Sequence, residues 1–223
     1  MNFYDNFISN LRSKKVTVGV IGMGYVGLPL AILAAKKNFR VFGYERDPYR
    51  LSMLKKKKSY FTNIPSSSLR VFSKKTKFFK KFSNISECDI LIICLPTPLK
   101  KNRPDLSHII TSMKSIYPQL KKGQLLILES TSYPGTTREE LCEKLYSKFR
   151  LGKEFFVGFS SERINPGIND KKIDVIPKVV SGYSRKCLSL CVKFYSNLFK
   201  HIVKAKSLEH AEFSKLLENI YRS

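Results

Sequence analysis

The 223-residue sequence lacks long apolar runs. No stretch reaches the roughly 18–20 consecutive apolar residues that a helix needs to span a bilayer. The first 15 residues have neither the apolar segment nor the small-residue cleavage site of a secretory signal. We therefore expect a cytoplasmic protein that does not enter a membrane.

Cysteine pairs and clustered histidines are also missing. The five cysteines include no CxxC pair, and an odd count without a secretory signal argues against a disulfide framework. The three histidines do not have the spacing of zinc ligands. We predict neither disulfides nor a metal site. The cysteines are Cys88, Cys94, Cys142, Cys187 and Cys191.

Acidic residues are scarce: 17 Asp and Glu stand against 41 Lys and Arg, which gives a formal net charge of +24. Such a balance is found in nucleic-acid-binding proteins, whose DNA affinity falls steeply with salt. Here the basic residues are mostly lysines spread along the chain, with local clusters at 55–58 and 74–81. We expect a solvated basic surface that attracts anionic nucleotides, and keep nucleic-acid binding as an alternative.

What the sequence does contain is a regular alternation of strands and helices. Residues 89–95, DILIICL, are almost continuously apolar, as in a strand buried on both faces of a parallel sheet. The alternation predicts an α/β fold, a Rossmann-type doubly wound and mostly parallel sheet with helices on both faces. The expected strands are 16–21, 40–45, 77–82, 89–95, 124–128, 155–159, 178–181 and 201–204, and the expected helices are 26–37, 48–57, 107–120, 136–149, 184–199 and 208–221.

A glycine-rich turn joins the first strand to the first predicted helix. Glycines in a GxGxxG pattern at this point allow a tight turn, a close approach of the backbone to a diphosphate, and tight packing of the helix on the strand. The helix N-terminus adds free N–H groups and the positive end of the helix dipole. The sequence therefore predicts a dinucleotide-binding site. Its residues are Gly22, Met23, Gly24, Tyr25, Val26 and Gly27.

Glu45 ends the second predicted strand, 18 residues after Gly27. A carboxylate at this place accepts hydrogen bonds from the ribose hydroxyls of adenosine and repels the 2′-phosphate of NADP. The neighbouring Arg46 could partly offset that repulsion. We predict that the cofactor is NAD rather than NADP.

Six sequence blocks in order resemble the UDP-glucose/GDP-mannose dehydrogenase family. They most resemble the UDP-N-acetylglucosamine 6-dehydrogenases of bacterial surface-polysaccharide pathways, with UDP-N-acetylmannosamine and UDP-glucose dehydrogenases as alternatives. The blocks are GMGYVGLP at 22–29, CLPTPL at 94–99, ESTSYPGTT at 129–137, FSSERINPG at 159–167, IPKVVSG at 176–182 and KLLENIYR at 215–222.

The resemblance implies a reaction in which C6 of a UDP-sugar is oxidised in two steps to a uronic acid, with two NAD as hydride acceptors. In that family a cysteine holds the intermediate aldehyde, which is then oxidised to a thioester and hydrolysed. The protein supplies orientation and electrostatics, whereas the cofactor supplies the hydride chemistry.

The resemblance also assigns roles to individual residues. Glu162 would be the acid/base glutamate and would bind substrate with Arg163, although a surface salt bridge between these two is the simpler alternative. Lys215 and Asn219, four residues apart on one helix face, would flank C6. The remaining assignments are Thr131 at the nicotinamide end, Pro96 and Thr97 along the dinucleotide cleft, and Arg50 either on the adenosine side or simply on the surface.

The family's chains are about twice as long as this one. They continue through a central helix into a UDP-binding domain that carries the catalytic cysteine in a GGHC-like loop, and nothing in this sequence resembles that loop. We expect an NAD-binding domain at 1–206 and a truncated central helix at 207–223, without the UDP-binding domain. The isolated chain would then be inactive, or would need a separate chain; the full-length family forms homo-oligomers. The alternative is a non-catalytic NAD-binding module.

The histidines His108, His201 and His210 match no site of the family. We expect each to be a surface or packing residue.

Overall fold

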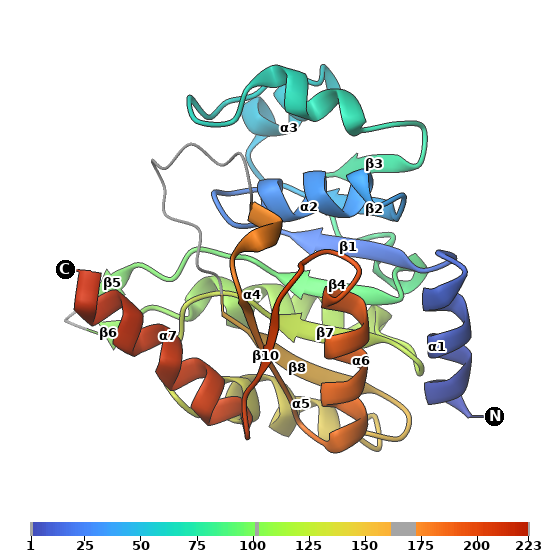
Figure 1. The fold of residues 1–223 in the computed structure, drawn as a ribbon, viewed down its shortest axis with the longest axis vertical. Coiled ribbons are helices and arrows are strands. Elements are labelled where there is room, and N and C mark those ends of the chain that lie inside the picture. Colours follow the sequence, from blue (N-terminus) through green and yellow to red (C-terminus); the bar gives the residue numbers. More distant parts are fainter. Residues whose placement is uncertain (1, 101–102, 162–172, 223) are drawn as a thin grey trace.

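The computed structural model describes residues 2–100, 103–161 and 173–222. An eight-stranded sheet forms its centre, in the order β10-β9-β8-β7-β4-β1-β2-β3. This confirms the predicted Rossmann-type, mostly parallel sheet (Figure 1). The strands are β1 (Thr17–Ile21), β2 (Arg40–Tyr44), β3 (Thr76–Phe79), β4 (Ile90–Ile93), β7 (Leu125–Leu128), β8 (Phe156–Ser160), β9 (Lys178–Gly182) and β10 (Ile202–Lys204).

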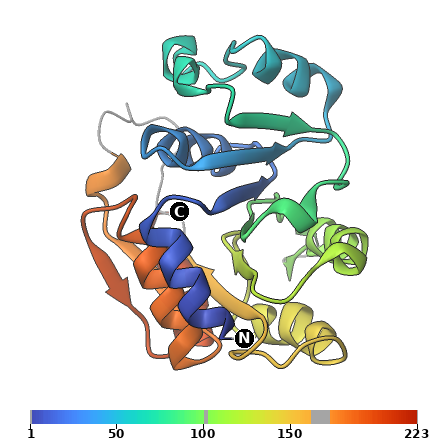
Figure 2. The ribbon, with the colours of Figure 1, turned by 90° about the vertical axis from the view of Figure 1, so that its right-hand side faces the viewer.

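Helices cover both faces of the sheet. Figure 2 shows α1 and α6 side by side on one face, with α4 and α5 on the other. The helices are α1 (Phe3–Arg12), α2 (Gly27–Lys36), α3 (Pro48–Lys55), α4 (Ser107–Ile116), α5 (Glu143–Tyr146), α6 (Arg185–Tyr195) and α7 (Leu208–Arg222).

The sheet divides the core into two apolar clusters because successive side chains of a strand point to opposite faces. In β4, Ile90 and Ile92 belong to the cluster under α1, α2 and α6, whereas Leu91 and Ile93 belong to the one under α4, α5 and α7. All four side chains are fully buried. The continuous apolar run noted in the sequence is therefore a strand covered on both sides.

The order of the strands reverses at β1. From β1 the chain moves outward through β2 to β3, and then returns to the other side of β1 to form β4, β7 and β8. Open α/β sheets bind ligands outside the carboxyl ends of their strands at such a switch point. The glycine turn follows β1, so the topology places it at this crevice.

Strand β9 runs antiparallel to β8, while β10 runs parallel to β9. The register pairs Gly158 with Gly182 and Ser160 with Val180. Consequently β9 begins at the edge of the sheet where β8 ends, which is the edge that carries the glycine turn.

Three features were not among the predicted elements. Helix α1 buries Phe7 and Leu11 against the sheet and is joined to α6 by a hydrogen bond of 2.8 Å between the Tyr4 hydroxyl and Ser189 Oγ. A two-stranded hairpin, β5 (Leu99–Lys100) and β6 (Arg103–Pro104), precedes α4. The predicted helix 136–149 starts as a π-helix, Thr137–Cys142, before it continues as α5.

In the part of the chain that the structure describes, no helix combines the length and apolar character needed to cross a membrane. The same residues contain no group of three or more His, Cys, Asp or Glu side chains arranged to hold a metal ion. All five cysteines are buried and unbridged.

Candidate dinucleotide-binding cleft

A cleft of about 1150 Å³ opens along the carboxyl ends of β1, β2, β4 and β7. This volume exceeds the usual range for drug-sized ligands and suits an extended one such as a dinucleotide. Its lining combines the glycine turn, the end of β2, the turns after β4 and β7, one face of α4, and Lys215 from α7.

Close packing fixes the glycine turn. Gly22 has a φ of 92°, and a Cβ there would lie 2.6 Å from the carbonyl oxygen of Cys94. A Cβ on Gly27 would lie 1.9 Å from the carbonyl oxygen of Gly22. Neither position therefore tolerates a side chain without movement of the backbone.

Gly24 differs from these two glycines. Apart from its two chain neighbours, no described residue has a heavy atom within 4 Å of the place where its Cβ would be, and Gly24 lines the cleft. The N-terminus of α2, directly after the turn, has no side-chain cap. Open space beside a glycine and an uncapped helix N-terminus together suit a phosphate group.

Glu45 lies at the end of β2, is nearly buried and lines the cleft. Its Oε1 accepts a hydrogen bond of 2.9 Å from the backbone N–H of Asp47, which holds the carboxylate in place. Arg46 and Arg50 line the same part of the cleft. The side chain of Asp47 caps α3 by accepting from the backbone N–H of Arg50 at 2.8 Å.

The turns after β4 and β7 form the opposite end of the cleft. Pro96 and Thr97 lie on the first turn and Thr131 on the second, and all three line the cleft. Ser130 joins the two turns, because its Oγ accepts from the backbone N–H of Leu95 at 2.9 Å.

A buried charge pair lies behind this end. Lys178, the first residue of β9, places its Nζ 3.1 Å from Oε1 of Glu129, and both side chains are almost completely buried. The hydroxyl of Tyr195 donates to the same oxygen of Glu129. Burial, followed by the Glu129 carboxylate, raises the pKa of Tyr195 well above its ordinary value, so this hydroxyl keeps its proton.

Lys215 reaches the cleft from α7. The helix is tied to the turn after β7 by Glu212, whose fully buried carboxylate accepts hydrogen bonds from the backbone N–H groups of Gly135 (2.6 Å) and Thr137 (2.8 Å). The Thr137 hydroxyl adds a third, at 2.6 Å. Burial raises the pKa of Glu212, while these hydrogen bonds oppose the shift.

The side chains of three predicted site residues are not described by the structure. Glu162 and Arg163 lie outside the described residues. Asn219 lies on α7 one turn after Lys215, but its side chain is also outside what the structure describes.

The cleft contains residues that the sequence did not suggest. Tyr44, Lys80 and Phe82 line it near Glu45, and the polar face of α4 lines it with Ser107, His108, Thr111, Ser112 and Ser115. His108 thus belongs to the cleft wall rather than to the outer surface. The polar spacing along 107–115 is the sequence signal that could have indicated this face.

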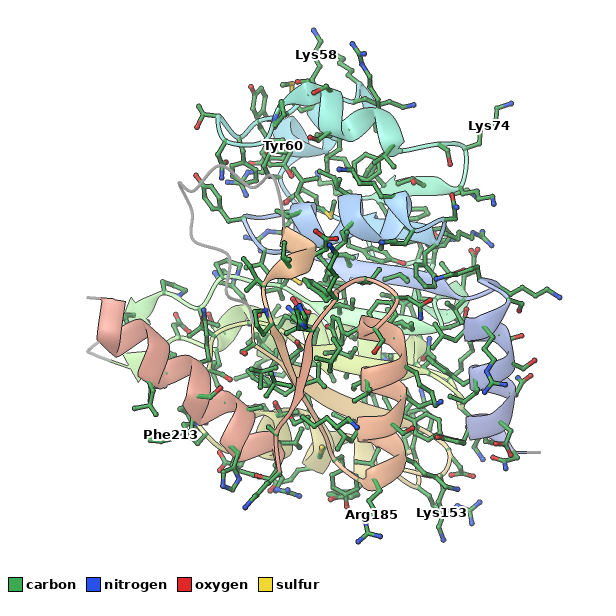
Figure 3. The ribbon with its side chains drawn as sticks, viewed as in Figure 1. Lys58, Tyr60, Lys74, Lys153, Arg185 and Phe213 are labelled. Atoms are coloured by element: carbon green, nitrogen blue, oxygen red, sulfur yellow. The ribbon has the colours of Figure 1, made fainter. Side chains whose placement is uncertain are left out.

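Basic side chains also lie on surfaces away from the cleft. Figure 3 shows Lys58, Lys74, Lys153 and Arg185 pointing outward from different sides of the molecule. The clusters noted in the sequence lie beside α3 and β3, at one edge of the sheet.

The fold and the glycine turn define the class of the protein, a Rossmann-type dinucleotide-binding domain. More narrowly, the chain belongs to the UDP-glucose/GDP-mannose dehydrogenase family, whose NAD-binding domain matches residues 16–203. The cofactor is therefore NAD, and the open space at Gly24, the uncapped α2 and the carboxylate of Glu45 fit it.

Known relatives agree with this assignment. The chain is 35% identical over 214 residues to a UDP-N-acetyl-D-glucosamine 6-dehydrogenase of Pseudomonas aeruginosa, covering 94% of this chain and 50% of the relative. It is 32% identical over 213 residues to a UDP-N-acetyl-D-mannosamine dehydrogenase of Pyrococcus horikoshii, with 92% and 50% covered.

Among solved structures, a UDP-D-ManNAc dehydrogenase from Pyrococcus horikoshii superposes with a TM-score of 0.86 at 29% identity, over 92% of this chain and 50% of that one. The chain thus spans about half the length of the relatives it matches.

Proposed function

We propose that this chain is the NAD-binding half of a UDP-N-acetylhexosamine 6-dehydrogenase, which oxidises the C6 alcohol of the sugar to a carboxylate for surface polysaccharides. UDP-N-acetylglucosamine is the preferred substrate, and UDP-N-acetylmannosamine and UDP-glucose are the alternatives. One observation carries the proposal: the glycine turn, Glu45 and Lys215 line a single cleft. NAD, when bound there, supplies the hydride acceptor.

The cleft divides the dinucleotide between its walls. The backbone N–H groups of the turn and of the α2 N-terminus hold the diphosphate. Glu45 accepts from the adenosine ribose, and Arg50 lies on the adenosine side. Pro96 and Thr97 would line the dinucleotide between its two ends, and Thr131 would lie at the nicotinamide end.

Lys215 is the residue of the described cleft best suited to the sugar. Its ammonium would stabilise the negative charge that develops on the C6 oxygen as its proton leaves. Asn219 would act beside it from the same helix, while Glu162 and Arg163 would take part in proton transfer and substrate binding.

We do not assign the nucleophilic cysteine to any of the five in this chain, because all are buried and none stands in a GGHC-like loop. Burial raises the pKa of Cys88 and of Cys142 to about 12, which keeps both as unreactive thiols. The nucleophile and the UDP pocket would therefore come from residues beyond these 223, on the same or a separate chain. In this division, 1–206 are the NAD domain and 207–223 begin the connecting helix.

Calorimetric titration with NAD and NADP tests the cofactor site, and NADH formation from UDP-N-acetylglucosamine tests the reaction. We expect NAD binding without turnover by the chain alone, and turnover when the C-terminal half of a relative is added. Lys215→Met should abolish the restored turnover and leave NAD affinity unchanged, whereas Lys206→Met, an exposed control, should change neither. Absence of NAD binding would exclude the assignment.

A non-catalytic NAD-binding module is the second candidate, and the burial of all five cysteines favours it. It predicts that NAD binds but that no complementing half restores turnover with any of the three UDP-sugars.

A further inference from the structure

The segment 59–61 crosses over the glycine turn without lining the cleft. It follows α3, and Figure 3 shows Tyr60 between α3 and α2. Two hydrogen bonds make the segment compact: Ser59 Oγ accepts from the backbone N–H of Phe61 at 3.1 Å and donates to its carbonyl oxygen at 3.0 Å.

Tyr60 holds one peptide group of the turn. Its hydroxyl donates a hydrogen bond of 2.5 Å to the carbonyl oxygen of Met23. The peptide that joins Met23 to Gly24 is planar and trans, so its C=O and N–H groups point in opposite directions. By holding the Met23 carbonyl, the Tyr60 hydroxyl also sets the direction of the Gly24 N–H.

The hydroxyl of Tyr60 keeps its proton and can therefore always donate this hydrogen bond. Burial, followed by the negative charge of Glu45, raises the pKa of Tyr60 above its ordinary value. The hydroxyl therefore remains protonated over the whole physiological range.

One further contact joins the segment to the turn, and Arg50 packs on the segment itself. The ring of Phe61 lies against that of Tyr25, with 4.1 Å between the centroids. The guanidinium of Arg50 lies 5.5 Å from the ring centroid of Tyr60 and 5.8 Å from that of Phe61, within reach of a cation–π interaction. The segment thus contacts the residues before and after Gly24.

Gly24 is the position that most needs such support. Glycine has more conformational freedom than any other residue, and this freedom must be lost when a ligand is held by its N–H. Apart from its chain neighbours, no described atom lies within 4 Å of its missing Cβ, so contacts at that position do not restrain it as they restrain Gly22 and Gly27. Its carbonyl oxygen accepts from the backbone N–H of Leu28 at 3.1 Å, but this bond holds the peptide group after Gly24 and not the one that carries its N–H.

We propose that Tyr60 is a positioning residue for diphosphate binding, which holds the Gly24 N–H in the direction that a phosphate oxygen of the dinucleotide requires. Tyr60 acts through the backbone and does not itself contact the cofactor. The inference rests on the proposed function only in that the chain binds NAD.

The variant Tyr60→Phe keeps the ring and removes only the hydroxyl, and Tyr49→Phe, at a side chain 66% exposed, is the matched control. Calorimetry would compare NAD, ADP and adenosine. Losing one oriented hydrogen bond should weaken NAD and ADP about 3- to 10-fold in Tyr60→Phe, and leave adenosine, which has no phosphate, unchanged. The control should match the wild type for all three ligands.

Unchanged NAD affinity in a folded Tyr60→Phe would overturn the inference. So would an equal loss for adenosine and ADP, since that would mean a general loss of structure. Failure of the wild type to bind NAD would instead contradict the proposed function.

Should the variant not fold, the wild type labelled with ¹⁵N-glycine provides the test. Addition of ADP should shift the Gly24 amide signal, and adenosine should not. A Gly24 signal that stays in place at saturating ADP would overturn the inference.

Discussion

The two ends of the cleft are built differently. At the turn end, residues 22–27 offer backbone groups, and Gly22 and Gly27 are packed so closely that a Cβ added to Gly27 would lie 1.9 Å from the Gly22 carbonyl oxygen. At the helix end, Lys215 is a side chain on a helix that the buried carboxylate of Glu212 ties to the turn after β7.

The outward face of α7 is a second difference between the two ends of the cleft. Phe213 and Leu217 on α7 are 49% and 41% exposed, and Figure 3 shows Phe213 pointing outward. The turn end is held by contacts from the segment 59–61, whereas α7 at the helix end exposes two apolar side chains. The comparison teaches that cofactor binding and substrate chemistry depend on separate structural supports.

The largest expected effect comes from Glu212→Ala. Its removal would leave two backbone N–H groups and one hydroxyl without their acceptor, so we expect a loss of about 3 kcal/mol in the free energy of unfolding. Urea denaturation measures this loss. Glu209→Ala removes a partly exposed carboxylate that pairs with Arg138 at 2.8 Å and also accepts from Ser207, and should cost about 1 kcal/mol. Equal losses in both variants would refute the special role of Glu212.

Next in size is a pair of substitutions at the turn end. Gly27→Ala forces a clash with backbone and should cost about 2 kcal/mol of stability. Gly24→Ala meets no described atom, so stability should stay within about 0.5 kcal/mol, while the methyl group in the cleft weakens NAD at least about 10-fold. Thermal melts and calorimetry separate the two effects; a strongly destabilised Gly24→Ala would contradict the open space.

A smaller change concerns cofactor choice. Glu45→Gln removes the charge that repels a 2′-phosphate, so the ratio of NADP to NAD affinity should rise about 10-fold. Calorimetry with both dinucleotides measures this ratio. Glu87→Gln, which disrupts a surface pair with Arg40, should leave it unchanged. A constant ratio in Glu45→Gln would mean that another group discriminates against NADP.

The smallest expected effect concerns Glu154, which precedes β8 at the amino ends of the strands, opposite the cleft. Hydrogen bonds from Arg150 and Lys122 lower the pKa of Glu154 to about 2. A carboxyl whose folded pKa is lowered stabilises the fold above its unfolded pKa, and this contribution disappears as the pH falls through about 2. Glu154→Gln should therefore melt below the wild type at pH 7, with a gap that narrows between pH 5 and pH 2. The exposed control Glu143→Gln should show no such gap.

Local patterns predicted most of the sheet. The apolar runs that became β1, β2, β4 and β7 ended within two residues of the expected positions, and the end of β4 was expected two residues too late because Cys94 and Leu95 continue its apolar run. Helix α1 could also have been found, since Phe3, Phe7 and Leu11 have helical spacing. The direction of β9 could not be predicted, because an apolar run does not encode whether its neighbour is parallel.

The candidate site also contains residues that the sequence predicted and contacts that it did not. The GxGxxG pattern follows one predicted parallel strand, and Glu45 ends the next. The sequence therefore predicted that Gly24 and Glu45 would lie at the carboxyl ends of the strands, where both line the cleft. The hydrogen bond that Tyr60 donates to Met23 joins residues 37 positions apart in the sequence. The hydrogen bond that Glu212 accepts from Gly135 joins residues 77 positions apart. No local pattern marks either pair, because each depends on how distant segments pack.

The antiparallel return from β8 to β9 has a consequence for how the sequence can vary. Parallel neighbours need a crossover that spans the whole sheet, whereas here both ends of the connection lie at the same edge. The entropy of closing such a loop grows only with the logarithm of its length, about 0.6 kcal/mol for each doubling. Insertions between these strands should therefore be tolerated by the sheet.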